Sequence, residues 1–139
     1  MTKRHVDVPP QMQAAIDTTI DAVDRRLSTA DDPAVAVREI LIDLFGDREA
    51  YDRYRSGDSL PRTAELRIRS YDPRNVLTET DRWAEQSAER LREATCLRYL
   101  WRAFDMSPLA HNVAVALPFR ELLAEHLFAE AGENLRLFR

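Results

Sequence analysis

The sequence predicts an all-α protein, a helical bundle of about five to seven helices. Apolar residues recur at steps of three and four along most of the chain, which is the spacing of an amphipathic helix. Proline, glycine and N-cap residues separate these runs, and with only three glycines long flexible loops are not expected. After the last glycine, Leu135 and Leu137 alternate, which predicts a short β-strand at the C-terminus.

Two helices are expected in residues 1–46, the first predicted domain. Pro10 suits the first turn of a helix that ends near Ser28, and Asp32 is an N-cap candidate for a second helix that ends at Gly46. The short connection between the two predicts an antiparallel hairpin. The apolar stripes comprise Met12, Ile16, Ile20, Val23 and Leu27 in the first helix, and Val37, Ile40, Leu41 and Leu44 in the second.

Residues 47–131 are expected to form a second helical domain, which begins with two short helices. Asp47 can cap the first of them, which Gly57 ends. Pro61 can open the other, which runs through Leu66 and Ile68. The segment 71–73 breaks the helical pattern because the residue before a proline is pushed out of the helical region.

Longer helices are expected in the rest of this domain. Thr78 and Asp81 have the spacing of a capping box, so a long helix should run from Glu79 to about Ala103. A turn through Ser107 and Pro108 follows, and a final helix is expected over residues 119–131. Gly132 is the expected stop of that last helix.

Composition and charge restrict the class of protein. The chain has 139 residues, is 45% hydrophobic and 32% charged, and has a formal net charge of -4 at pH 7, which suits one ordinary soluble domain. The acidic balance argues against a general nucleic-acid surface, although a local basic patch stays open. There is no uncharged span near the length that crosses a membrane, and no apolar core follows the first four residues. A single cysteine, Cys96, fits a reducing compartment, so we expect a cytoplasmic protein that binds no membrane and no nucleic acid.

The residues that usually carry chemistry do not form a recognisable site. His5, His111 and His126 show no zinc-ligand spacing with one another or with Cys96, so no metal site is expected. A partly buried packing role is favoured for His126, and a small buried hydrophobe is favoured for Cys96. The sequence has neither a glycine loop that cradles phosphate nor a nucleophile elbow. We therefore expect no catalytic residue and no cofactor bound by this segment.

One group of aromatic residues and arginines has two interpretations. Aromatic faces stack on sugars while arginine bonds to hydroxyl groups, so the group could bind a sugar or another planar ligand. The alternative, which we favour, is packing between helices with a solvated rim of arginines. The group consists of Tyr51, Tyr54, Tyr71 and Trp83, with Arg53, Arg55, Arg67 and Arg69.

The last third of the chain resembles a known family. The residues that carry the resemblance are Leu100–Pro108, Arg120–Phe128 and Gly132–Asn134, and less firmly Tyr54–Gly57 and Tyr71–Pro73. In this order and spacing they resemble the N-terminal helical segment of maltose and galactoside O-acetyltransferases. These enzymes are hexapeptide-repeat acyltransferases with a left-handed β-helix.

The resemblance implies transfer of an acetyl group from acetyl-CoA to a sugar or a similar small hydroxyl acceptor, in a homotrimer. It implies that a histidine of the β-helix is the general base, and that this histidine, the coenzyme groove and the repeats follow Arg139. Residues 132–139 would then be the start of a β-helix coil, or otherwise a C-terminal tail. Tyr71 and Asp72 are the positions that the resemblance indicates for binding substrate hydroxyls.

Three functional hypotheses stay open from the sequence. The first is the helical N-terminal domain of an acetyl-CoA-dependent O-acyltransferase, without a catalytic site of its own. The second is an independent all-α module for protein interaction or regulation. The third and weakest is a nucleic-acid-binding helical domain. The sequence identifies neither the acceptor substrate nor the role of residues 1–46.

Overall fold

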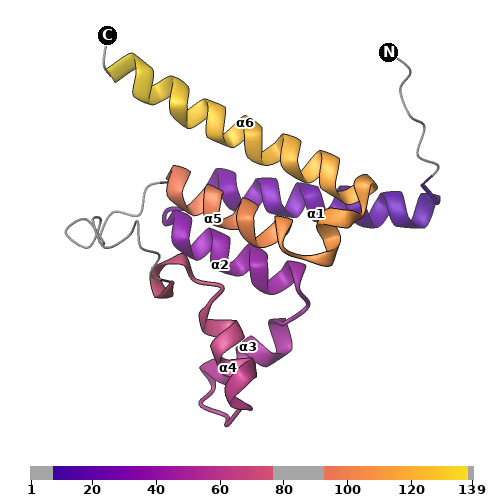
Figure 1. Cartoon of the computed structure of the whole chain (residues 1–139), viewed down its shortest axis with the longest axis vertical. Helices are drawn as coiled ribbons and strands as arrows, with labels where there is room; N and C mark the ends of the chain where they lie inside the picture. The colour runs from indigo at the N-terminus through magenta and orange to yellow at the C-terminus, as the bar shows by residue number, and fades with distance from the viewer. Residues whose placement is uncertain (1–7, 77–92, 138–139) are drawn as a thin grey trace. The chain divides into compact units, whose positions relative to one another are not determined.

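The computed structural model describes residues 8–76 and 93–137, and every regular element in this part of the chain is a helix (Figure 1). The all-α prediction is therefore confirmed, with six α-helices in the described ranges. The α-helices are α1 (Pro10–Thr29), α2 (Pro33–Leu44), α3 (Arg48–Arg55), α4 (Arg62–Arg69), α5 (Glu93–Asp105) and α6 (Val113–Leu137). Two 3-10 helices, η1 (Pro73–Asn75) and η4 (Pro108–His111), lie after α4 and α5.

The chain divides into two compact units. The first joins the N-terminal segment through Ser28 to the segment from Trp101 onward, and the second comprises Thr29–Leu100. The boundary between them therefore falls at the end of α1 and within α5. The division by sequence into 1–46, 47–131 and 132–139 stays a prediction.

Helix α2 is the most buried element of the second unit. Asp32 caps its first turn, because the Asp32 carboxylate accepts a hydrogen bond from the backbone N–H of Ala34 at 3.0 Å, and Pro33 occupies the first helical position. Val37, Ile40, Leu41 and Ile42 are almost completely buried. The predicted cap is thus confirmed, and so are three of the four predicted stripe residues, whereas Leu44 is only half-buried and Ile42 is an addition.

Glycines end α2 and α3 as expected. Gly46 has φ 69° and Gly57 has φ 85°, the left-handed conformation that glycine adopts without a steric penalty. The N–H of Asp47 bonds to the carbonyl of Ile42 at 2.9 Å, and the N–H of Asp58 bonds to the carbonyl of Arg53 at 3.0 Å. These are Schellman caps, which satisfy carbonyls that a helix end leaves without partners.

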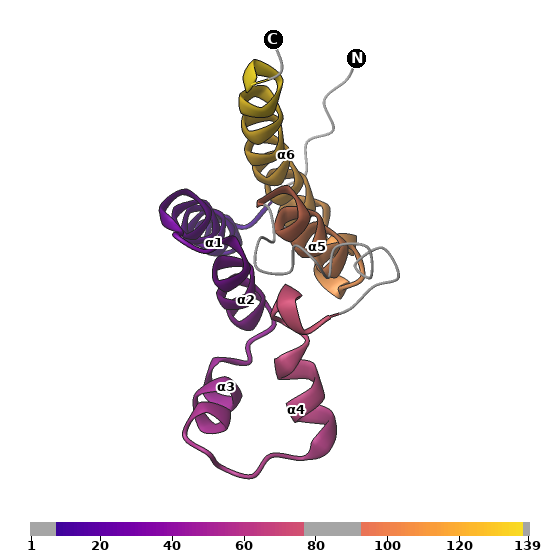
Figure 2. The ribbon, with the colours of Figure 1, turned by 90° about the vertical axis from the view of Figure 1, so that its left-hand side faces the viewer.

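Contacts link the short elements of the second unit to α2 or to one another. Helix α2 contacts both α3 and η1, and α3 contacts α4 (Figure 2). Tyr51 of α3 and Ile68 of α4 are the buried residues of these two short helices. Their position matters for the site because Tyr71 and Asp72 follow directly after α4.

The first unit contains α1, η4, α6 and the end of α5. Phe104 and Phe119 are fully buried and stack with ring centroids 4.1 Å apart. His126 Nε2 lies 2.9 Å from Asp24 Oδ1, which ties α6 to α1. Other buried apolar residues of this unit are Ile16, Val23, Leu27, Ala116, Leu122 and Leu123.

The C-terminal expectations are wrong in two respects. Helix α6 does not stop at Gly132 but continues to Leu137, so the strand predicted from Leu135 and Leu137 is not formed. A glycine weakens a helix by about 1 kcal/mol without ending it, and the alanine, glutamate and leucine residues around it favour helix. Helix α6 also begins at Val113, before the predicted start, and includes Pro118 in its second turn.

Part of the predicted long helix lies outside the described residues. The segment Glu93–Asp105 forms α5, while the capping box at Thr78 and Asp81 and the expected helix start at Glu79 fall in the range 77–92. Trp83, a member of the aromatic group, also lies there.

Candidate functional site at Tyr71 and Asp72

Tyr71 and Asp72 connect α4 to η1 and are both buried, with 6% and 7% of their surface exposed. Pro73 follows them, so Asp72 adopts an extended backbone conformation at φ −89° and ψ 116°. This conformation makes Asp72 the N-cap of η1. The turn that the sequence predicts at 71–73 therefore holds both candidate residues in fixed positions.

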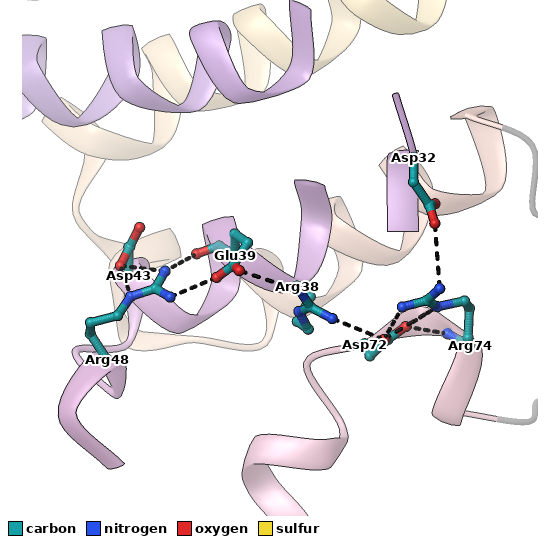
Figure 3. A network of polar contacts seen from close by, with 7 residues as sticks. All are labelled: Asp32, Arg38, Glu39, Asp43, Arg48, Asp72 and Arg74. Atoms are coloured by element: carbon teal, nitrogen blue, oxygen red, sulfur yellow. Dashed lines mark hydrogen bonds and ion pairs between the residues drawn. The ribbon is translucent and has the colours of Figure 1, made fainter. Parts of the chain in front are cut away.

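The Asp72 carboxylate is already bonded on both oxygens. Oδ1 accepts from the backbone N–H of Arg74 at 2.9 Å and from Arg74 Nε at 3.0 Å. Oδ2 accepts from Arg74 Nη2 at 2.7 Å and lies 3.8 Å from Arg38 Nη1 (Figure 3). A charged two-point contact of this kind is among the stronger hydrogen bonds in proteins.

Asp72 belongs to a continuous network of ion pairs and hydrogen bonds (Figure 3). The further links are Arg74 Nη1 to Asp32 Oδ2 at 3.4 Å, Arg38 Nη2 to Glu39 Oε1 at 3.3 Å, Arg48 Nη1 to Glu39 Oε2 at 2.7 Å and Arg48 Nε to Asp43 Oδ1 at 2.9 Å. The network connects the N-cap of α2, the middle of α2, the start of α3 and the N-cap of η1. It therefore holds together elements that are far apart in the sequence.

Arg38 is the central cation of this network. Its guanidinium carbon lies 5.6 Å from the centre of the buried Tyr51 ring, and those of Arg48 and Arg55 lie 5.8 and 6.0 Å from it. The Arg38 Nε atom is buried and has no hydrogen-bond partner among the described residues. Contact with the face of an aromatic ring partly compensates a desolvated guanidinium.

Tyr71 belongs to a second cluster. Its hydroxyl donates to the Asp47 carboxylate, which also accepts from Arg67 Nε at 2.8 Å and from Arg67 Nη2 at 3.1 Å. The Tyr71 ring stacks on Phe45 with centroids 5.8 Å apart. Asp47 was expected to cap α3, but its side chain makes no cap hydrogen bond and holds Arg67 and Tyr71 instead.

The surroundings in both clusters stabilise the ionised form of the carboxylates. Burial acts to raise the pKa values of Glu39 and Asp72. The hydrogen bonds and charges of Arg48 and Arg38 outweigh this effect for Glu39, and those of Arg74, with the charge of Arg38, outweigh it for Asp72. Both pKa values therefore lie below the ordinary range. The bond from Arg67 lowers the pKa of Asp47 against the effect of its burial.

These environments do not favour proton transfer. Burial, followed by the bond to the Asp47 carboxylate, raises the pKa of the Tyr71 phenol, so its hydroxyl stays protonated and donates to Asp47. A carboxylate whose pKa is held low by arginine is a weak base at neutral pH. The arrangement therefore performs a structural task, which is to fix the turn at 71–73. Hydroxyl binding by Tyr71 and Asp72 stays a prediction, and it would require the exchange of existing partners.

The aromatic group of the sequence does not form one surface in the described residues. Tyr51 lies among Arg38, Arg48 and Arg55, whereas Tyr71 lies with Arg67 and Asp47. Tyr54 is half-buried on α3. Packing with an arginine rim, the interpretation that the sequence favours, agrees with these contacts.

The other candidate residues have separate surroundings. His111 is exposed and His126 bonds to Asp24, while His5 lies outside the described residues. Cys96 is fully buried in α5. Across the described ranges, no three His, Cys, Asp or Glu side chains are grouped so that they could hold a metal ion.

Most members of the network have no local signal in the sequence. Asp32 was predicted, but only as a helix cap, and the local pair of Asp72 and Arg74 is visible in the sequence as neighbours on a turn. The contacts of Arg67 with Asp47, twenty positions apart, and of Arg38 with Asp72 have no local pattern. Only the fold brings these charges together.

No protein-family model, curated protein or solved structure matches this chain. In the described part of the chain, no helix has the length and apolar character needed to cross a membrane. The functional interpretation therefore depends on the geometry of the chain itself.

Replacement of Asp72 by alanine tests whether this residue has a structural role. Asp72→Ala removes the cap of η1 and the main partner of Arg74, so the free energy of unfolding should fall by about 2 kcal/mol or more. Urea denaturation measures this loss. The matched control is Asp58→Ala, whose exposed carboxylate lies 3.6 Å from Arg53, and it should cost at most about 0.5 kcal/mol. Equal small losses for both variants would contradict the structural role.

The pH dependence of stability tests the paired carboxylates. The pKa values of Glu39, Asp47 and Asp72 are lower in the folded protein than the ordinary values of 4.5, 3.8 and 3.8, so the unfolded chain takes up protons first as the pH falls. The stability that they contribute is present above these ordinary values and is lost as the pH falls through the folded-state values. Urea midpoints measured from pH 7 to pH 3 should fall mainly below about pH 5. A midpoint that does not change over this range would contradict the expected ion pairing.

Proposed function

We propose that this chain is an all-α protein-interaction module, which acts by binding other protein surfaces rather than by its own chemistry. The observation that carries the proposal is the outer face of α6, defined as Val113, Leu117 and Phe128. These side chains are 51%, 56% and 75% exposed. They lie on the same helix as the buried residues Phe119 and Leu123.

The two faces of α6 differ from those of an ordinary surface helix. Such a helix buries one apolar stripe and presents charged or polar residues on the opposite side. At 100° per residue, the outer face is centred about 120° away from the stripe of Ala116, Phe119 and Leu123. Because α6 is apolar on both sides, part of its apolar surface is left in water.

Exposed apolar surface of this kind supports a binding role. Single exposed hydrophobic residues are ordinary, but several on one face indicate a site for protein contact. Phe128, 75% exposed, is an aromatic candidate for an anchor, and aromatic residues are enriched at the centres of interfaces. Met106, 79% exposed in the turn before η4, adds apolar surface to the same unit.

The charges of the second unit support the same conclusion. Arg38, Arg48, Arg67 and Arg74 each have a carboxylate partner within that unit. Paired arginines are poor sites for phosphate, which needs unbalanced positive charge. The contacts thus favour a rigid scaffold over a nucleic-acid surface.

The acyltransferase hypothesis stays a prediction. One of its supports was the helix stop at Gly132, where the resemblance implies entry into a β-helix coil, and α6 continues through that position. Because that hypothesis gives these residues no catalytic site of their own, acetylation of a sugar by residues 1–139 would count against it.

Photo-crosslinking from the outer face tests the proposed function. A benzophenone amino acid placed at Leu117 should form discrete protein adducts in an extract of the source cells, because that position faces the bound partner. The control places the same group at Ala129, which is exposed and lies about 120° further around α6. Adducts at neither position, or equal adducts at both, would contradict the proposal. Mass spectrometry of each adduct separates a second copy of this chain from a different protein.

A further inference from the structure

We propose that the outer face of α6 binds a basic amphipathic helix of another protein, whose lysine or arginine side chains pair with Glu121 and Glu125. This inference rests on the proposed function and names the chemistry of the partner. It depends on where the charges of α6 lie relative to its exposed apolar residues.

Two exposed glutamates border the outer face along one side, and we call this pair the acidic edge. At 100° per residue, Glu121 and Glu125 lie about 50° and 90° from the centre of the outer face, in the same direction around the helix. Glu121 follows Leu117 by one turn, and Glu125 precedes Phe128 by three residues. Each glutamate is therefore a neighbour of a large exposed apolar residue on the surface of the helix.

The acidic edge has no cation of its own in the part of the chain that the structure describes. Neither glutamate forms an ion pair there, and Arg120, on the other side of the outer face, is held by Asp105 at 2.9 Å. Glu121 and Glu125 are four residues apart, and like charges at that spacing repel each other and weaken a helix. A cation from a partner would relieve this repulsion.

The known neighbours of α6 lie on its other sides. His126, whose Nε2 lies 2.9 Å from Asp24 of α1, is about 170° around α6 from the centre of the outer face. Phe119, which stacks on Phe104 of α5, is about 150° from that centre. The contacts with α1 and α5 therefore leave the outer face and its acidic edge open to a partner.

A helix with one apolar side and one basic edge fits this pattern. The stretch from Val113 to Phe128 is about 23 Å long, so a partner helix of about four turns spans it. The apolar side of the partner would cover Leu117 and Phe128, and cations one turn apart would match the spacing of the acidic edge. An acidic helix would bring like charges together, so the charge selects a basic partner. Because a single helix pair is a small contact, the expected complex is weak, with a dissociation constant of about 100 μM.

Binding of synthetic helical peptides to the full chain tests the proposal. The basic probe has about 16 residues, with leucines along one side and lysines along one edge of that stripe. The acidic probe has glutamate at each lysine position, and a scrambled probe has the composition of the basic one without the stripe. Fluorescence anisotropy at low ionic strength should show that the basic probe binds at least about tenfold more tightly than either of the others.

Reversal of the acidic edge identifies the binding site. Glu121→Lys combined with Glu125→Lys should exchange the preference, so that the acidic probe binds more tightly than the basic one. The matched control is Glu49→Lys combined with Asp52→Lys, which makes the same change in net charge at two exposed positions of α3. The control should keep the preference for the basic probe. Circular dichroism and urea midpoints establish that each variant is folded.

Two further measurements separate the apolar contact from the charges. Phe128→Ser should weaken binding of the basic probe at least about fivefold, because it removes the aromatic anchor. Salt raised from about 0.05 to 0.5 M should also weaken this binding, because exposed charges are screened. In the variant with Glu121→Gln and Glu125→Gln, the effect of salt should be small.

The outcomes separate this inference from the proposed function. Equal binding of the basic and acidic probes, or a basic preference that survives reversal of the acidic edge, would overturn the inference. The absence of basic-probe binding up to about 500 μM would overturn it as well. If one of these results occurs while the benzophenone at Leu117 captures a protein, the partner has different chemistry or is a second copy, and the interaction module stands. If the photo-crosslinking fails too, the proposed function fails with the inference.

Discussion

The contact between the buried Asp72 carboxylate and the guanidinium of Arg74, with Arg38 close by, is the constraint around which the second unit is organised. A buried carboxylate is tolerated only when its charge is paired and its oxygens are bonded. Here one carboxylate caps η1 and also joins that turn to α2 through the arginines. Because Arg48 and Glu39 continue the chain of contacts to α3, the positions of the short elements depend on this set of charges.

This arrangement determines which surfaces stay available for binding. Paired side chains already hold their partners, so a ligand that needs Asp72 or the hydroxyl of Tyr71 must displace an arginine or Asp47. The apolar outer face of α6 has no such competition. Paired charges therefore hold the elements of the second unit together, whereas α6 has exposed apolar residues that are open to a second surface.

The features that followed from the sequence are local ones. The cap at Asp32, the glycine stops at Gly46 and Gly57, and the break at Pro73 depend on a few neighbouring residues, and all are confirmed. The predicted stop at Gly132 was wrong because a glycine permits a helix end without requiring one. The flanking residues favour helix, and α6 continues to Leu137. Contacts such as Asp47 with Arg67, and the apolar outer face of α6, depend on tertiary packing and were not predictable from spacing alone.

A double-mutant cycle on Asp72 and Arg74 tests the central constraint most directly, because it isolates the free energy of their contact. Urea denaturation of the unsubstituted chain, Asp72→Ala, Arg74→Ala and the double variant should give a coupling energy of about 1 kcal/mol or more. A coupling energy near zero would contradict the account.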